Sequence, residues 1–356
     1  MSCKYIIHEP KMKKIEEKIL EFVKSNPDAS SSKIRSGLDE KASIATIKRA
    51  LSRLVSSRAL EVVGRGRGTK YVLSAYYRLF KEIDMEEYYT QEIDQREIIE
   101  DFNTLLLDEI LPNVALFSGE EIEFLDDLQR KFTQNISQLS QIEIDKEMER
   151  LAIDLSWKSS QIEGNTYSLL ETERLLKEKQ TASGKTQQEA IMLLNHKEAI
   201  DFVIQNRSYL TPLSISKIED IHTILTQELQ VERSIRKRRV GISGTNYRPL
   251  DNAFQITDAL KKSCEIINSR KNVFEQALLS LLLISYIQPF VDGNKRTARI
   301  VSNAILFNSQ HCPLTFRTVD SIDYKKAMLL FYEQNNIVAF KKIFIEQYAF
   351  ATQTYF

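Results

Sequence analysis

The amino-acid sequence predicts a mostly helical protein with more than one domain, and three observations support this prediction. The chain has 356 residues, which is longer than one compact core usually requires. It contains only 10 glycines and 7 prolines, so residues that interrupt helices are scarce. Apolar side chains recur at helical spacing, and the 42% hydrophobic and 28% charged content is typical of a folded, soluble chain.

Charge, cysteine content and apolar runs exclude several classes of protein. The 49 basic and 49 acidic residues cancel, so a nucleic-acid partner would have to meet a local patch. The three cysteines, Cys3, Cys264 and Cys312, are odd in number and widely spaced, which excludes a disulfide framework and a cysteine zinc site. The start of the chain does not resemble a signal peptide, and the most apolar run, 277–287, is about half as long as a membrane span. We therefore expect a cytoplasmic protein without membrane contact.

Residues 1–75 predict a small α+β domain. A helical stripe over 12–25 is followed by a Ser-rich connector and a short helix that ends near Gly37. A second stripe runs from Ile44 to Val55, and two β-like runs, 60–63 and 71–73, flank the Gly-rich sequence GRGRGTK. Three helices followed by a basic hairpin is the order of a winged helix-turn-helix domain.

The charge of this domain predicts binding to double-stranded DNA. Between Lys41 and Lys70 there are eight basic residues and one acidic residue, a net charge of +7, concentrated on the second helical stripe and the Gly-rich loop. Alternatively, the basic residues form a solvated face of a domain that binds other proteins. Such modules commonly bind two half-sites, so a homodimer is compatible with the pattern but not fixed by it. The candidate DNA-binding residues are Ser43, Thr46, Lys48, Arg49, Arg65 and Arg67.

The remaining chain divides into a helical connector, 76–150, and a long helical region, 151–356. The connector is acidic, has a capping box from Ser118 to Glu121 and shows no chemistry of its own. The long region is interrupted at 240–249 by VGISGTNYRP, whose two glycines and alternating apolar residues predict a β-hairpin. Because an isolated hairpin is marginally stable, we expect it to lie at the rim of a site.

The sequence QPFVDGNKRTAR, at 288–299, carries the most specific signal for chemistry. A glycine turn that leads into a helix exposes backbone N–H groups and forms a ready anion site. Three cations follow within six residues, and Asp292 can hold a divalent cation that bridges phosphates. An ordinary helix junction with a solvated basic face is the alternative, but the ordered combination of residues favours a cradle for nucleotide phosphates.

This stretch resembles the signature of the Fic (Fido) family, HPFx(D/E)GN(G/K)RxxR. The sequence WKSSQIEGN, at 157–165, is similar to the family's inhibitory motif, and 240–249 occupies the place of its β-hairpin flap. The resemblance covers roughly residues 150–350. It implies a Fic-type helical core that moves a nucleotide monophosphate, usually AMP from ATP, to a Ser, Thr or Tyr hydroxyl of a protein target.

The resemblance also implies a role for each matching residue. Phe290 would anchor the loop, Asp292 would hold Mg²⁺, and Glu163 would pair with Arg299 and keep ATP in an unproductive pose. The nucleotide-binding residues would be Gly293, Asn294, Lys295, Arg296 and Arg299. The inhibitory residues would be Ser159, Glu163 and Gly164. The target-binding flap would comprise Ile242, Ser243, Gly244 and Thr245.

Gln288 departs from the family, which has histidine at this catalytic position. A carboxamide has no usable basicity near pH 7, and general-base assistance is worth roughly 10²- to 10⁴-fold in rate. Three explanations are open: a natural pseudoenzyme, a weakly active transferase, or an introduced or strain-specific substitution. His222 lies on the apolar face of IEDIHTIL and is expected to be a core histidine, not a substitute base.

We favour a nucleotide-binding, DNA-binding regulator with impaired AMP transfer. The alternative is an autoinhibited protein adenylyltransferase. Both use Mg²⁺ with ATP.

Overall fold

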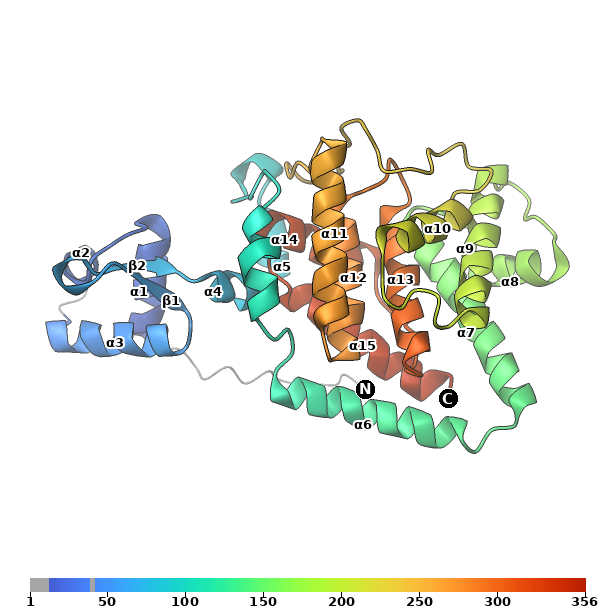
Figure 1. Cartoon of the computed structure of the whole chain (residues 1–356), viewed down its shortest axis with the longest axis horizontal. Helices are drawn as coiled ribbons and strands as arrows, with labels where there is room; N and C mark the ends of the chain where they lie inside the picture. Colours follow the sequence, from blue (N-terminus) through green and yellow to red (C-terminus); the bar gives the residue numbers. More distant parts are fainter. Residues whose placement is uncertain (1–12, 39–41) are drawn as a thin grey trace. The chain divides into compact units, whose positions relative to one another are not determined.

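The computed structural model describes residues 13–38 and 42–356, and within these the prediction of a mostly helical chain is confirmed. The chain divides between Lys81 and Glu82 into two compact units, which are described separately (Figure 1). Among the described helices, none is long and apolar enough to cross a membrane.

Unit 1 contains the three helices and two strands that the sequence predicts. The two strands are antiparallel, with Leu60 opposite Leu73, and a 3₁₀ turn joins them. Tyr71 also donates its backbone N–H to Ala29, which extends the hydrogen bonding beyond the hairpin. The elements are α1 (Lys14–Ser25), α2 (Ser31–Gly37), α3 (Ile44–Ser56), β1 (Leu60–Val63), η1 (Gly66–Gly68), β2 (Lys70–Leu73) and α4 (Ala75–Phe80).

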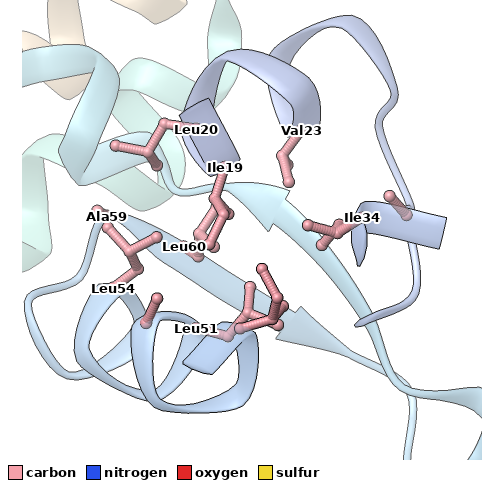
Figure 2. Packing of buried hydrophobic residues seen from close by; sticks show 11 residues of the cluster. Ile19, Leu20, Val23, Ile34, Leu51, Leu54, Ala59 and Leu60 are labelled. Atoms are coloured by element: carbon pink, nitrogen blue, oxygen red, sulfur yellow. The ribbon is translucent and has the colours of Figure 1, made fainter. Parts of the chain in front are cut away.

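One apolar core holds unit 1 together. Side chains from α1, α2, α3 and β1 converge in it, as Figure 2 shows for Ile19, Ile34 and Leu51. Gly37 lies close to this core, and a Cβ atom there would stand 2.0 Å from the ring of Phe22 and displace it. In the stripe predicted for α3, Ile47, Leu51 and Leu54 are buried, whereas Val55 is partly buried and Ile44 is 45% exposed.

Unit 2 begins with short elements and continues as long helices. The short ones are α5 (Met85–Thr90), the 3₁₀ turns η2 (Ile93–Gln95) and η4 (Leu111–Asn113), and the π-helical turn η3 (Leu106–Ile110). The long helices are α6 (Gly119–Ile136), α7 (Gln141–Ile162), α8 (Leu169–Glu178), α9 (Gln187–Gln205), α10 (Ile215–Leu225), α11 (Ala253–Ser269), α12 (Val273–Ile287), α13 (Asn294–Asn308), α14 (Ser321–Gln334) and α15 (Val338–Thr354).

Most of the helical connector expected over 76–150 lies in the same compact unit as the helices that follow it. Residues from Glu82 onward belong to unit 2, and α7 continues through residue 150 without interruption. The predicted capping box at the start of α6 is present, with Ser118 and Glu121 bonded reciprocally.

Helix α12 forms the centre of unit 2. Its apolar run is buried from Ala277 to Ile287, and it packs against α11 and α13 (Figure 1). Because α12 and α13 are consecutive and adjacent, the short loop between them is fixed at both ends. This loop carries the residues that the sequence singled out.

Candidate functional site

The loop between α12 and α13 is closed by its own hydrogen bonds. The backbone N–H of Phe290 donates to Oδ1 of Asn294 (2.8 Å), and Nδ2 of Asn294 donates to the carbonyl of Phe290 (2.8 Å). Phe290 is fully buried, as expected of an anchor. Gly293 has a φ of +83° and is the N-cap of α13, so the first N–H groups of the helix, which have no partner within the helix, lie at this turn. The loop therefore presents the helix N-terminus as an anion site.

A cavity of about 380 Å³ opens in front of this loop. Its volume is within the range of small-molecule sites. The predicted residues that line it are Glu163, Ile242, Ser243, Gln288, Asp292, Gly293, Asn294, Lys295 and Arg296. Sequence reasoning missed the remaining lining residues, Gly241, Val291, Lys325, Met328, Leu329 and Tyr332, four of which belong to α14.

Glu163 is clamped between two cations at the edge of this cavity. Its Oε1 accepts from Nη2 of Arg299 (2.8 Å), and its Oε2 pairs with Nζ of Lys295 (3.2 Å). Burial acts to raise the pKa of Glu163, but the charges of Arg299 and Lys295 outweigh it and lower the pKa to about 2. Arg299 itself is fully buried behind Glu163. The predicted pairing of these two residues is confirmed.

Ser159 extends this pairing into the core. Its hydroxyl oxygen accepts from Nε of Arg299 (2.7 Å), and its carbonyl accepts from Nη2 of the same side chain (3.0 Å). The hydroxyl also bonds Nε2 of His196 on α9 at 2.6 Å. Burial and, after it, the charge of Arg299 hold the pKa of His196 well below its ordinary value, so this histidine is neutral. Gly164 ends the motif with a φ of +101°.

The side chain of Gln288 joins the end of α12 to the start of α13. Its Nε2 donates to the carbonyl of Ser285 (2.6 Å), and its Oε1 accepts from Nδ2 of Asn294 (2.9 Å). The residue has a φ of +52° and is 8% exposed. Both polar atoms of the amide are therefore used for structure, and neither is a base.

Arg296 of α13 and Asp292 of the loop form an ion pair with each other. Arg296 is 2% exposed, and its Nη1 has no hydrogen-bond partner among the residues that the structure describes. The side chain of Asp292 is 65% exposed, with Oδ2 at 3.0 Å from Nη2 of Arg296. No group of three His, Cys, Asp or Glu side chains in the described chain is arranged for a metal. The site fits Mg²⁺ held by one carboxylate and by the phosphates of a ligand, which is how Mg²⁺ commonly binds.

The segment 240–249 is not the predicted hairpin. It has a turn at Ser243 and Gly244, and no strand ladder forms in it. Its backbone groups bond to distant chain instead: the N–H of Arg248 donates to Glu100 (2.6 Å), and the carbonyl of Gly244 accepts from Arg96 (3.3 Å). These two bonds connect Gly244 and Arg248 to residues 96–101. Ile242 and Ser243 line the cavity, whereas Gly244 and Thr245 are not among its lining residues.

His222 is buried, as predicted, but it has a role that the sequence did not reveal. Its Nε2–H donates to the carbonyl of Asp292 (2.9 Å), and its ring stacks on Phe290 with centroids 3.7 Å apart. The same ring lies 3.4 Å from the point where a Cβ atom of Gly293 would stand. Burial lowers the pKa of His222 to about 4, so the neutral ring supports the loop.

The candidate DNA-binding residues lie on α3 and on the turn after β1. Ser43 caps α3, since its hydroxyl accepts the N–H of Thr46 (3.1 Å), and both side chains are exposed. Lys48 and Arg49 are also exposed on this helix. Arg65 precedes the 3₁₀ turn Gly66–Gly68, and Arg67 lies within it. Of the residues counted in the predicted charge, Lys41 lies outside the described residues.

The part of the chain that contains the loop between α12 and α13 is similar to known proteins. Residues 212–306 match the model of the Fic/DOC family. Over 183 residues the chain is 28% identical to "Protein adenylyltransferase Fic" of Nematostella vectensis, covering 47% of this chain and 40% of the relative. Over 171 residues it is 25% identical to "Protein adenylyltransferase fic-1" of Caenorhabditis elegans, covering 46% and 33%. The chain thus spans less than half the length of these curated relatives.

Solved structures show the same fold. A fragment of Fic-1 from C. elegans superposes with a TM-score of 0.59 at 19% identity, covering 66% of this chain and 72% of that one. A Fic domain containing signaling protein from Bacteroides thetaiotaomicron gives a TM-score of 0.56 at 18% identity, covering 65% and 94%.

Proposed function

We propose that the cavity, part of which lies in the region 212–306 that matches the Fic/DOC family model, binds Mg²⁺·ATP in an autoinhibited form and transfers AMP slowly or not at all. The observation that carries this proposal is the clamp on Glu163, which holds a carboxylate against Arg299 and Lys295 at the phosphate-binding loop. A carboxylate in this place marks where the site accepts negative charge. The terminal phosphate of ATP would compete with Glu163 for the same two cations.

The residues around the loop support nucleotide binding. The N-terminus of α13 and the unpartnered Nη1 of Arg296 favour an anion, and Asp292 offers one exposed carboxylate to the metal that accompanies phosphates. Mg²⁺, when bound, would neutralise phosphate charge there. The likeness to proteins named adenylyltransferase supports ATP as the nucleotide.

The contacts of Gln288 support impaired transfer. A transferase of this family needs a base for the attacking hydroxyl, and the amide of Gln288 is bonded on both sides to Ser285 and Asn294. His222, a buried histidine that contacts the loop, already uses its Nε2–H to bond the backbone carbonyl of Asp292. Loss of a general base costs roughly 10²- to 10⁴-fold in rate. The alternative, an adenylyltransferase that is restrained only by Glu163, requires positioning and metal alone to suffice.

Transfer of radiolabelled AMP from ATP separates the two. Four forms are compared for label on themselves and on lysate proteins: the native chain, Glu163→Gly, Gln288→His and the double variant. Label only where Gln288→His is present supports the impaired site. Label on Glu163→Gly with Gln288 intact favours the transferase. Calorimetry of ATP binding to Asp292→Ala/Arg299→Ala tests both, because an unchanged affinity would overturn either function.

A second function, DNA binding, is proposed for unit 1 as a winged helix-turn-helix domain, and the exposed cations of α3 favour it. Lys48 and Arg49 project from a capped helix, and the β1–β2 turn carries two further arginines. We expect Lys48→Glu/Arg49→Glu to weaken binding to duplex DNA and to reduce the slope of log affinity against log salt by about 2. The matched control, Lys14→Glu/Lys24→Glu on α1, should leave both nearly unchanged. Equal effects of the two variants would contradict DNA binding through α3.

A further inference from the structure

A strongly basic segment precedes the residues that rim the cavity. Residues 232–239 contain five basic side chains and one acidic side chain, in a chain whose total charge is zero. One of them, Arg236, is fully buried. Its guanidinium donates to the carbonyls of Gln288 (2.7 Å), Arg238 (2.8 Å) and Leu250. The backbone N–H of Arg236 donates to Pro289 at 2.9 Å. The basic segment is therefore fixed to the loop of the candidate site.

The other cations of the segment face solvent. Arg238 is 63% exposed and lies 3.5 Å from Glu232, and Arg239 is 87% exposed and lies 2.7 Å from Asp251. Exposed ion pairs of this kind are worth about 0 to 1 kcal/mol. A carboxylate of another chain can therefore replace Glu232 or Asp251 at small cost. Lys237 is exposed as well.

Lys237 and Arg239 border a groove that is separate from the cavity. Its volume is about 470 Å³, and it is lined by Lys237, Arg239, Asp251, Asn252, Ala253 and Phe254. The side chain of Phe254 is 87% exposed. The groove thus combines positive charge with one accessible aromatic ring, which suits an acidic chain that also carries an apolar side chain.

The groove lies a short distance along the chain from the cavity. Arg239 is followed closely by Gly241, Ile242 and Ser243, which line the cavity. Three residues of extended chain span at most about 11 Å. A segment whose hydroxyl enters the cavity therefore reaches the groove with residues that are only a few positions away.

We propose that this groove is a docking subsite for the acceptor protein, and that it selects a segment with carboxylates and one apolar residue within about four positions of the modified hydroxyl. The inference rests on the proposed function, since it names the substrate class of the same site. Arg236 fixes the subsite relative to the loop, so acidic residues bound by Lys237 and Arg239 would place the hydroxyl at the cavity.

Fluorescence anisotropy with defined probes tests the subsite without requiring catalysis. The probes are a fluorescein-labelled peptide with one serine, one leucine and four glutamates, its counterpart with four glutamines, and a single-stranded oligonucleotide of equal charge. We expect the full chain to bind the acidic peptide about tenfold more tightly than the glutamine peptide. Lys237→Glu/Arg239→Glu should abolish that preference. The matched reversal on α6, Arg130→Glu/Lys131→Glu, should keep it.

Three results overturn the subsite: equal affinity for the two peptides, a preference that survives the reversal, or tighter binding of the oligonucleotide that depends on the same two cations. If the reversed variant fails to fold, Lys237→Gln/Arg239→Gln replaces it. Calorimetry of ATP binding to the same proteins keeps the two proposals distinct. Intact ATP binding without acidic preference refutes only the subsite, whereas absence of ATP binding refutes the proposed function.

Discussion

Removal of the charge from Glu163 has a cost that follows from its contacts. The pKa of this carboxyl is about 2 instead of its ordinary 4.5, and each unit corresponds to about 1.4 kcal/mol. The ion pairs of Glu163 therefore stabilise the folded state by about 3 kcal/mol. Breaking a buried pair by removing one partner costs about 3 to 5 kcal/mol, which agrees in size. Because the folded pKa is depressed, this stabilisation is present above pH 4.5 and is lost as the pH falls toward 2.

Glu163→Gln should consequently lower the Tm of unit 2 by about 6 °C. Fluorescence of Trp157, the single tryptophan of the chain, reports this transition, since its indole N–H donates to Tyr167 at 3.0 Å within unit 2. Glu173→Gln is the matched control. Its carboxylate forms an exposed i,i+4 pair with Lys177, so we expect a change of about 1 °C or less.

The same substitution should strengthen ATP binding. Under the proposed function, the terminal phosphate competes with Glu163 for Arg299 in the native chain, whereas the uncharged side chain of the variant competes less. Calorimetry should show an affinity at least about tenfold higher, which corresponds to roughly half of the 3 kcal/mol. The affinity of the native chain for ATP should not change between pH 5 and 8, because Glu163 remains ionised in this range. A variant that melts like Glu173→Gln, or that binds ATP no more tightly than the native chain, would refute this reasoning.

Three further perturbations test the support of the loop. Burial lowers the pKa of His222 to about 4, so the unfolded chain takes up this proton at a higher pH than the folded chain, and the free energy of unfolding falls as the pH decreases from about 6.5 to 4. His222→Phe should reduce the slope of the free energy of unfolding against pH, measured by urea unfolding, by up to about 1.4 kcal/mol per pH unit. Identical slopes for the variant and the native chain would show that His222 is not responsible. Gly293→Ala places a Cβ atom at a φ of +83° and should cost about 1 kcal/mol or more and weaken ATP binding, measured by urea unfolding and calorimetry. Arg236→Lys loses the bonds to the carbonyls of Gln288 and Leu250, which should destabilise unit 2 by about 1 to 3 kcal/mol and accelerate tryptic cleavage within 232–250.

Local patterns in the sequence were sufficient to predict many of the helices and the loop between α12 and α13. The apolar run of α12 and the capping box at Ser118 depend on neighbours in sequence, and both are present. The hairpin at 240–249 was predicted on the same basis and is wrong. Arg248 in this segment forms an isolated β-bridge and a side-chain hydrogen bond with Asp101, which is 147 positions away. A local sequence pattern cannot predict a partner at this distance along the chain.

Buried polar contacts were the second kind of feature that could not be predicted. His222 could be assigned to the core from its helix face, but its bond to Asp292 joins α10 to a loop 70 residues later. His196 meets Ser159 across 37 residues, and Arg236 meets Gln288 across 52. A single sequence contains the donors and acceptors of these bonds, yet their pairing depends on the packing of whole helices.

The contacts of Gln288 show how a glutamine supports the loop at this position. The residue ends α12 with a φ of +52°, a conformation that costs a non-glycine side chain about 1 kcal/mol or more. Two hydrogen bonds of the amide, to Ser285 and from Asn294, offset this cost because each is worth about 1 kcal/mol. An imidazole that served as a base would have to leave one ring nitrogen unprotonated and free of such a bond. Gln288→His should therefore be the less stable protein even where it transfers AMP, and a variant at least as stable as the native chain would show that these two bonds do not hold the loop.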